Sequence, residues 1–190
     1  MSTLFVNNLN TASGSTITVP TGKQVIGTDS ATFKQPGMIL QTIAGNSNTV
    51  FDSTSTSWTD TGLFSLTFPQ NLQSGSKVLA RIMATIGETN NNNWSNRMNL
   101  SIFENTTNKG DATYGMTNGN AQHQGTTHTQ YEANRITGEV LFTPSVLNGT
   151  YKLYFKGETS NITYYVGRTS HNGTQNPTGQ TQIILQEIAQ

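Results

Sequence analysis

Histidine and carboxylate side chains are the groups in this chain that could bind a metal or move protons. The three histidines are His123, His128 and His171. His123 and His128 stand five residues apart in AQHQGTTHTQ, so a strand would point them to opposite faces. No H-E-x-x-H spacing or neighbouring carboxylate accompanies them, and we therefore predict no metal site and no cofactor within one copy of the chain.

The ten acidic residues are scattered through the sequence. Hydrolysis of a glycosidic bond needs two carboxylates that face each other about 5–10 Å apart, and no spacing here predicts such a pair. The sequence also lacks a G-x-S-x-G, P-loop or dinucleotide-binding pattern. We therefore expect that the chain is not an enzyme.

Three long polar segments are better candidates for a binding function. ETNNNNWSNR, TNGNAQHQGTTHTQY and RTSHNGTQNPTG combine many amides and hydroxyls with a few rings, the groups that hold a sugar, and recognition usually lies on loops of a rigid scaffold. The candidate glycan-binding residues are Asn92, Trp94, His123, His128, Tyr131, His171 and Asn172. The alternative is that these segments are solvated connections, with Trp94 packed over an edge of the fold.

The composition restricts the classes of protein to which the chain can belong. Ten basic and ten acidic residues cancel without forming a cluster, so we expect no nucleic-acid partner. There is no cysteine, which excludes disulfides and thiol chemistry. Charged residues make up 11% of the chain, against about 25% in typical globular domains. Their place is taken by Thr, Asn, Ser, Gln and Gly, which favour strands and turns.

The elements that must position these loops are predicted to be strands, because apolar residues recur with a period of two and never with the helical period. The predicted strands are residues 37–43, 49–52, 62–68, 77–87, 97–104, 136–142, 150–157, 162–168 and 181–188, with a weaker one at 112–116. The inward residues are clearest in two of them: Val78, Ala80, Ile82 and Ala84, and Tyr151, Leu153 and Phe155. About eight strands with long connections predict two packed antiparallel sheets, an all-β jelly roll.

Membrane insertion is not expected. The longest apolar-rich stretch, residues 78–86, contains Arg81 and is much shorter than the roughly 18–20 residues that cross a bilayer. The first residues also lack a basic segment followed by a long apolar one, so no signal peptide is expected.

Residues 1–36 differ from the rest and are predicted to form an extended β arm, joined at Pro36 to a head domain of residues 37–190. Their short apolar runs cannot offset an ordering cost of about 1–2 kcal/mol per residue if they pack alone. We expect them to pair with the same arm of neighbouring copies; an arm folded back on its own head is the alternative. The predicted interface residues are Leu4, Val6, Ile17, Val19 and Val25 in the arm, together with Tyr164 and Tyr165, of which one must leave the core.

Several stretches carry a resemblance to a known family. They are the opening MSTLFVNNLNTASGSTITVPTGKQVIGTD, then PGMILQTI, TSWTDTGLFSLTFPQNLQSGSKVLARI, GTYKLYFKGE and the closing TQIILQEIA. With these stretches the chain resembles the tail fibre-like virion proteins of tailed bacteriophages, common among marine phages of cyanobacteria. The resemblance covers both ends and much of the middle, but not residues 106–134.

The resemblance implies a jelly-roll head like those of the tumour-necrosis-factor and complement C1q type, assembled as a homotrimer. It implies a tail fibre or fibre-tip protein that is assembled in the bacterial cytoplasm and contacts other virion proteins and host-surface glycans. A capsid cement or decoration protein at three-fold positions is the first alternative, and a stand-alone carbohydrate-binding module is the second. In a trimer, one histidine from each copy could also meet on the axis around a metal.

Overall fold

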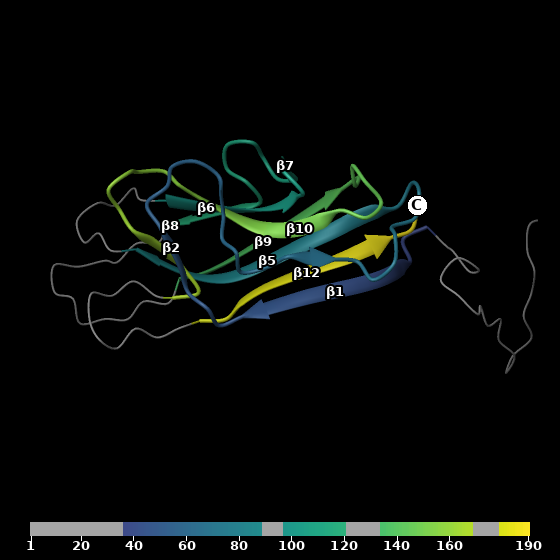
Figure 1. Ribbon diagram of the computed structural model, residues 1–190, viewed down its shortest axis with the longest axis horizontal. Coiled ribbons are helices and arrows are strands. Elements are labelled where there is room, and N and C mark those ends of the chain that lie inside the picture. The colour runs from purple at the N-terminus through teal and green to yellow at the C-terminus, as the bar shows by residue number, and fades with distance from the viewer. Residues whose placement is uncertain (1–35, 89–96, 121–133, 169–178) are drawn as a thin grey trace, which may run out of the picture. The chain divides into compact units, whose positions relative to one another are not determined.

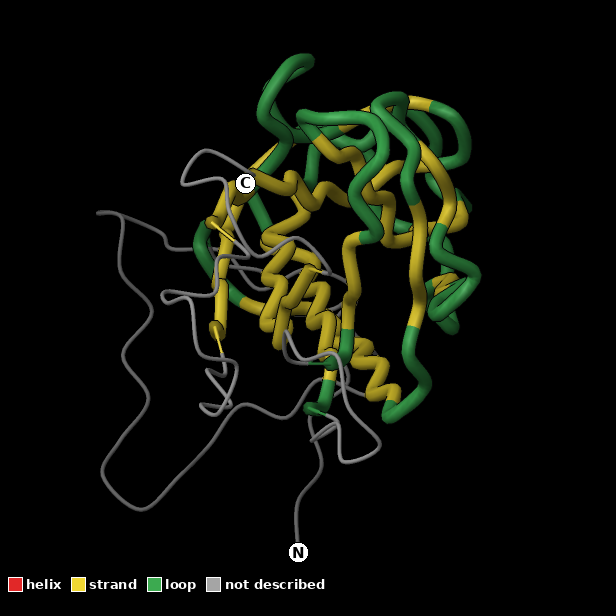
Figure 2. Tube along the Cα trace, turned by 90° about the vertical axis from the view of Figure 1, so that its left-hand side faces the viewer, coloured by secondary structure: helices red, strands yellow, loops and turns green. Residues whose placement is uncertain are grey.

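The computed structural model describes residues 36–88, 97–120, 134–168 and 179–190, and every structural statement below concerns these ranges. Their regular structure is entirely strand, with no helix (Figures 1 and 2). The strands are β1 (Ile39–Ser47), β2 (Phe51–Ser53), β3 (Thr59–Asp60), β4 (Leu66–Thr67), β5 (Lys77–Glu88), β6 (Arg97–Glu104), β7 (Thr107–Asn108), β8 (Thr117–Asn120), β9 (Asn134–Phe142), β10 (Thr150–Gly157), β11 (Tyr164–Val166) and β12 (Thr181–Ile188). The all-β prediction is confirmed. The predicted domain boundary at residue 36 falls at the edge of the described residues and stays a prediction.

The long strand β5 is the centre of the first sheet, called sheet A here. One edge of β5 pairs with β12 over residues 77–83 and with β11 over residues 86–88, while β9 pairs along the other edge. β1 continues the sheet beyond β12, and β2 continues it beyond β11. All of these pairings are antiparallel, as predicted.

The second sheet, sheet B, is built on the pair β10 and β6. The short strands β3 and β4 pair with the outer edge of β10, and β7 and β8 pair with the outer edge of β6. The two sheets are stacked as a β-sandwich (Figure 1).

The core lies between the sheets and is filled by the residues that the alternation predicted. Its fully buried side chains come from sheet A (Val78, Ala80, Ile82, Ala84, Ile86, Tyr164, Val166, Ile183, Leu185) and from sheet B (Met98, Leu100, Ile102, Tyr151, Leu153, Phe155). The predicted inward faces of β5 and β10 are therefore confirmed.

Two predicted strands differ from the structure. Residues 62–68 keep the alternation, with Phe64 and Phe68 buried, but only Leu66–Thr67 form a strand, after a glycine at positive φ (66°) at Gly62. Residues 112–116 are not a strand. They form a turn in which the Asp111 carboxylate accepts the backbone N–H groups of Thr113 and Tyr114, both at 2.8 Å. The strand next to this turn is β8.

Candidate functional site

The glycan-binding candidates all lie outside the described residues. These are Asn92, Trp94, His123, His128, Tyr131, His171 and Asn172, and the same holds for the five arm residues Leu4, Val6, Ile17, Val19 and Val25. Their roles stay predictions. The described residues, however, fix where each of these segments leaves and rejoins the sandwich.

The three long polar segments have their borders at the same end of the sandwich. Their borders are Glu88, Arg97, Asn120, Asn134, Arg168 and Gly179. Arg97 pairs with Asn120, Asn134 pairs with Ile86, and the Gly179 N–H donates to the Gly167 carbonyl at 2.8 Å. In Figure 1 all of these strand ends lie together, on the left. The three segments that carry the predicted binding residues therefore start from the same end of the fold.

The point where residues 1–35 join the sandwich lies at the opposite end. The Gly37 N–H donates to the Ala189 carbonyl at 2.8 Å, and Ile39 pairs with Ile188, which pairs with Lys77 at the start of β5. The N-terminal connection and the borders of the three long segments thus lie at opposite ends of the sandwich.

The two predicted interface tyrosines lie on opposite faces of β11. Tyr164 is fully buried in the core, and its hydroxyl accepts the Thr159 N–H at 3.2 Å. Its ring therefore packs within the sandwich. Burial raises the pKa of the Tyr164 hydroxyl above its usual range. Tyr165 points the other way, where the Arg168 guanidinium lies 4.1 Å from its ring centroid. Tyr165 is the member of the pair that leaves the core.

The outer face of sheet A carries several aliphatic side chains that nothing in the described chain covers completely. Leu141 is 51% exposed and lies directly opposite the partly exposed Leu79. Ile39 is 47% exposed and lies opposite Ile188. Partly exposed Ile184 lies on β12 opposite Arg81, and Gln186 separates it from Ile188. These five residues are called the sheet A patch below.

An exposed ion pair and a shallow pocket interrupt the sheet A patch. Arg81 Nε lies 2.5 Å from Glu139 Oε2, across the β5–β9 ladder. The pocket beside this pair has a volume of about 260 Å³, and Met83 and Thr137 form part of its lining. Lys77 also lies on this face, opposite Ile188, so charged side chains alternate with the aliphatic ones.

The outer face of sheet B is covered by its own chain. Phe103 on β6 is stacked on Tyr154 of β10, with ring centroids 3.9 Å apart, and Trp58 tilts against Phe103 at 5.7 Å. The Trp58 Nε1–H donates to the carbonyl of Ala112 at 3.0 Å, and this bond ties residues 105–116 over the sheet. Residues 105–116 together with Trp58 are called the sheet B cover.

Gly115 shows how closely the cover is fitted to the sheet. Its φ is +70°, and a Cβ there would lie 2.6 Å from the Leu100 carbonyl oxygen and 2.7 Å from the Trp58 ring. Asn108 Oδ1 also accepts the Ser101 hydroxyl at 2.5 Å. Only glycine combines this backbone conformation with this space.

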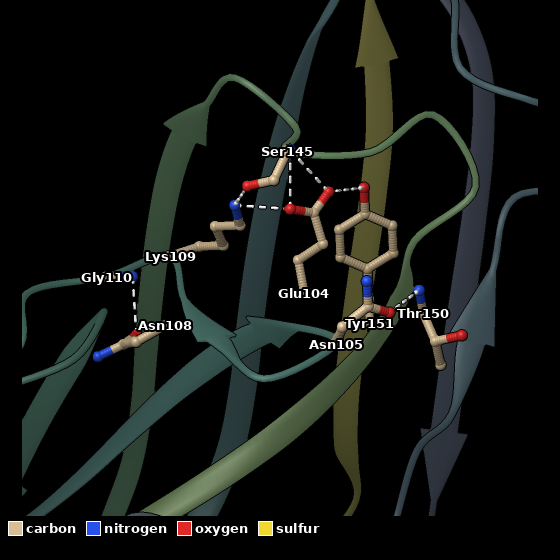
Figure 3. Close-up of polar contacts among 8 residues, drawn as sticks. All are labelled: Glu104, Asn105, Asn108, Lys109, Gly110, Ser145, Thr150 and Tyr151. Atoms are coloured by element: carbon tan, nitrogen blue, oxygen red, sulfur yellow. Dashed lines mark hydrogen bonds and ion pairs between the residues drawn. The ribbon is translucent and has the colours of Figure 1, made fainter.

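A buried ion pair anchors the start of the cover (Figure 3). Glu104, 1% exposed, lies 2.6 Å from Lys109 Nζ and accepts the Ser145 N–H at 2.8 Å and the Tyr151 hydroxyl at 3.2 Å. Burial alone would raise the pKa of the Glu104 carboxyl, but the Lys109 ammonium and the Ser145 N–H hold it below its usual range. The same cluster raises the pKa of Tyr151, chiefly through burial and then through the Glu104 charge.

This cluster brings serine, lysine, glutamate and tyrosine together, but its geometry suits fixation rather than catalysis. Lys109 Nζ is the donor in its 2.7 Å hydrogen bond to the Ser145 hydroxyl and is also paired with Glu104, so it is not placed to accept a proton from Ser145. A serine nucleophile needs a neutral base beside it. We therefore interpret the cluster as the link between the β6–β7 turn and the β9–β10 loop.

Within the described ranges, no group of three His, Cys, Asp or Glu residues could hold a metal ion. The same ranges contain no helix with the length and hydropathy of a membrane span.

The sequence analysis did not predict which side chains lie on the outer faces of the two sheets or what covers them, although the sequence of β5 contained one signal. The outer side of β5 carries two apolar residues, Leu79 and Met83, which alternate with the buried residues and flank Arg81. The contact between Trp58 and Ala112 joins residues 54 positions apart and has no local signal.

Comparison with known proteins adds no family to these observations, since no family model and no curated protein matches the chain.

Proposed function

We propose that this chain is a structural protein of a phage particle, a homotrimeric tail fibre or fibre-tip head. Residues 1–36 attach it to other virion proteins, and the three long segments at the far end face the host surface. The proposal combines the resemblance to tail fibre-like proteins with the architecture of the sandwich.

The strand order supports a jelly-roll head. If the eight strands β1, β4, β5, β6, β8, β9, β10 and β12 are numbered in chain order, sheet A reads 1-8-3-6 and sheet B reads 2-7-4-5. Two interleaved Greek keys produce this order, and they define a jelly roll.

The observation that carries the proposal is the separation of the two ends. A fibre tip must be held at one end and recognise at the other, and loops on a rigid β scaffold are the usual place for recognition. Here the N-terminal connection at Gly37 and the borders of the three segments lie at opposite ends of β5. The candidate glycan contacts, such as Trp94 and His171, all belong to these segments.

Electron microscopy of particles tests this function. Antibodies against the recombinant chain, visualised with gold on purified phage, are expected to label the tail. Label on the capsid shell would reject the fibre reading in favour of a cement protein. Absence of label and of the chain's peptides in a mass-spectrometric digest would reject a virion role altogether.

A further inference from the structure

We infer that Asn148, in the loop between β9 and β10, is a site of spontaneous deamidation, and that its isoaspartate product loosens the anchor of the sheet B cover. Asn148 is followed by Gly149, and an asparagine before a glycine can lose its side-chain amide without an enzyme. The inference concerns the chemistry of this loop and does not depend on the proposed function.

The reaction needs no co-reactant other than water. The backbone nitrogen of Gly149 gives up its proton and forms a bond to Cγ of Asn148, while the bond from Cγ to the amide nitrogen breaks and that nitrogen leaves as ammonia. Water then opens the cyclic succinimide at either carbonyl. One product is aspartate. The other is isoaspartate, in which the main chain runs through the former side chain and is longer by a methylene group.

The first argument is the difference between two Asn-Gly pairs in the described chain. Asn148 is exposed and lies in a turn. Asn118 and Gly119 lie in β8, where they pair with Asn99 and Met98 of β6. The glycine nitrogen must rotate toward the asparagine side chain before it can attack. A surface turn allows this rotation at a low cost in free energy, whereas a paired strand must first separate from its neighbour.

The second argument is that packing requires a glycine after Asn148. A Cβ at position 149 would lie 2.8 Å from Cγ of Glu104 and 3.1 Å from its Oε1. A side chain on the residue after an asparagine shields the backbone nitrogen, and glycine has no side chain. The close contact with the buried Glu104 therefore demands the residue type that leaves the Asn148 amide open to attack.

The third argument concerns the effect of the longer main chain. The loop is fixed on both sides of Asn148, because the Leu147 carbonyl accepts the Leu72 N–H at 2.7 Å and the Thr150 N–H donates to Asn105 Oδ1 at 3.1 Å. The same loop supplies a backbone N–H to the carboxylate of the buried ion pair, at 2.8 Å. An added methylene group does not fit between these fixed points, so isoaspartate is expected to displace the loop from the anchor.

Peptide mapping of the incubated chain tests the site. After incubation of the full-length protein at mildly alkaline pH, cleavage at lysine and arginine releases residues 136–152, in which Asn148 is the only side-chain amide. The mass change from amide to carboxyl in this peptide therefore reports Asn148 alone, and two products should separate by chromatography. Asn118, followed by fragmentation of residues 110–135, is expected to convert at least about 10-fold more slowly, because β8 must open first.

The matched controls are Asn148→Gln and the wild type unfolded in urea. Asn148→Gln is expected to show no conversion in residues 136–152, because the larger ring forms far more slowly. In urea, where β8 no longer protects its pair, Asn118 and Asn148 are expected to convert at similar rates. The inference is overturned if Asn148 keeps its amide in the folded chain, whether or not it converts in urea. It is also overturned if Asn118 converts as fast as Asn148 in the folded chain.

A second experiment measures the effect on the anchor. Asn148→Asp adds the charge of the product on an ordinary main chain, and because the position is exposed, its urea midpoint is expected to stay near that of the wild type. The isoaspartate form, purified from the incubated protein, is expected to unfold at a lower urea concentration than Asn148→Asp. Equal midpoints for these two forms would overturn the link between deamidation and the anchor of the sheet B cover.

Discussion

The two outer faces of this sandwich differ in how their apolar side chains are covered. Sheet B places Phe103 and Tyr154 on its outer side and lays residues 105–116 and Trp58 over them. Sheet A places Leu79, Leu141 and Ile184 on its outer side and leaves them partly exposed. An apolar outer face needs cover in either case. The comparison indicates that sheet B obtains its cover from residues close to it in the fold, whereas no described segment covers the aliphatic side chains of sheet A.

Lys109→Met is expected to have the largest effect, because it removes the cation from the buried Glu104 at the start of the sheet B cover. Breaking a buried pair by removing one partner costs about 3–5 kcal/mol, since the remaining charge is uncompensated. We expect this loss in the free energy of unfolding, measured by urea denaturation at one protein concentration. In Glu104→Leu/Lys109→Met the charges leave together, and much of the stability is expected to return. Equal losses in the single and double variants would contradict this explanation.

Trp58→Ala is expected to have the next largest effect on stability. The change removes the ring that packs on Phe103, the hydrogen bond to Ala112 and the ring below Lys156 Nζ, which lies 5.8 Å from its centroid. We expect a loss of about 3 kcal/mol by chemical denaturation, at the low end of large-to-small changes because Trp58 is only partly buried.

The matched change on sheet A is Leu141→Ala, measured in the same way. Leu141 is half exposed in the single chain, so its truncation is expected to cost less than about 1 kcal/mol of the chain's own stability. Comparable losses for Trp58→Ala and Leu141→Ala would remove the distinction between a covered and an uncovered sheet.

Acid is expected to weaken the anchor of the sheet B cover. The folded-state pKa of Glu104 is lowered, so the unfolded chain binds the proton more readily than the folded chain as the pH falls. The pair therefore contributes its full stability above the unfolded pKa, roughly 4.5, and loses it as the pH falls through the folded value. Urea midpoints measured from pH 7 downwards are expected to fall less steeply in Lys109→Met. An unchanged slope in that variant would assign the acid sensitivity to other groups.

The sandwich was largely predictable from the sequence, because the alternation of apolar residues within each strand is a local signal. The period-two alternation predicted the buried faces of β5 and β10, and residues 97–104, 150–157 and 181–188 were predicted with the bounds that β6, β10 and β12 have. The sheet B cover was not predictable, because it depends on a contact between Trp58 and Ala112 and on the turn at Asp111. Those interactions arise only once the strands are paired.

The predicted binding residues illustrate a second limit. The three polar segments were chosen for their composition. The fold brings their borders to one end of the sandwich, and this proximity could not be predicted from their positions along the chain. The outer face of sheet A was not predicted for a different reason. Leu79 and Met83 alternate with the buried residues of β5, but an alternation pattern does not say whether the chain itself covers them.

Arg81→Gln is expected to have the smallest effect on the stability of the single chain. The side chains of Arg81 and Glu139 are 50% and 54% exposed, and ion pairs in such positions contribute roughly 0–1 kcal/mol and are screened by salt. The unfolding midpoint of Arg81→Gln is therefore expected to move little and to be the same in low and high salt. Glu139→Gln, which leaves Arg81 unpaired, should reproduce this result. A clear loss of stability in either variant would show that the ion pair supports sheet A.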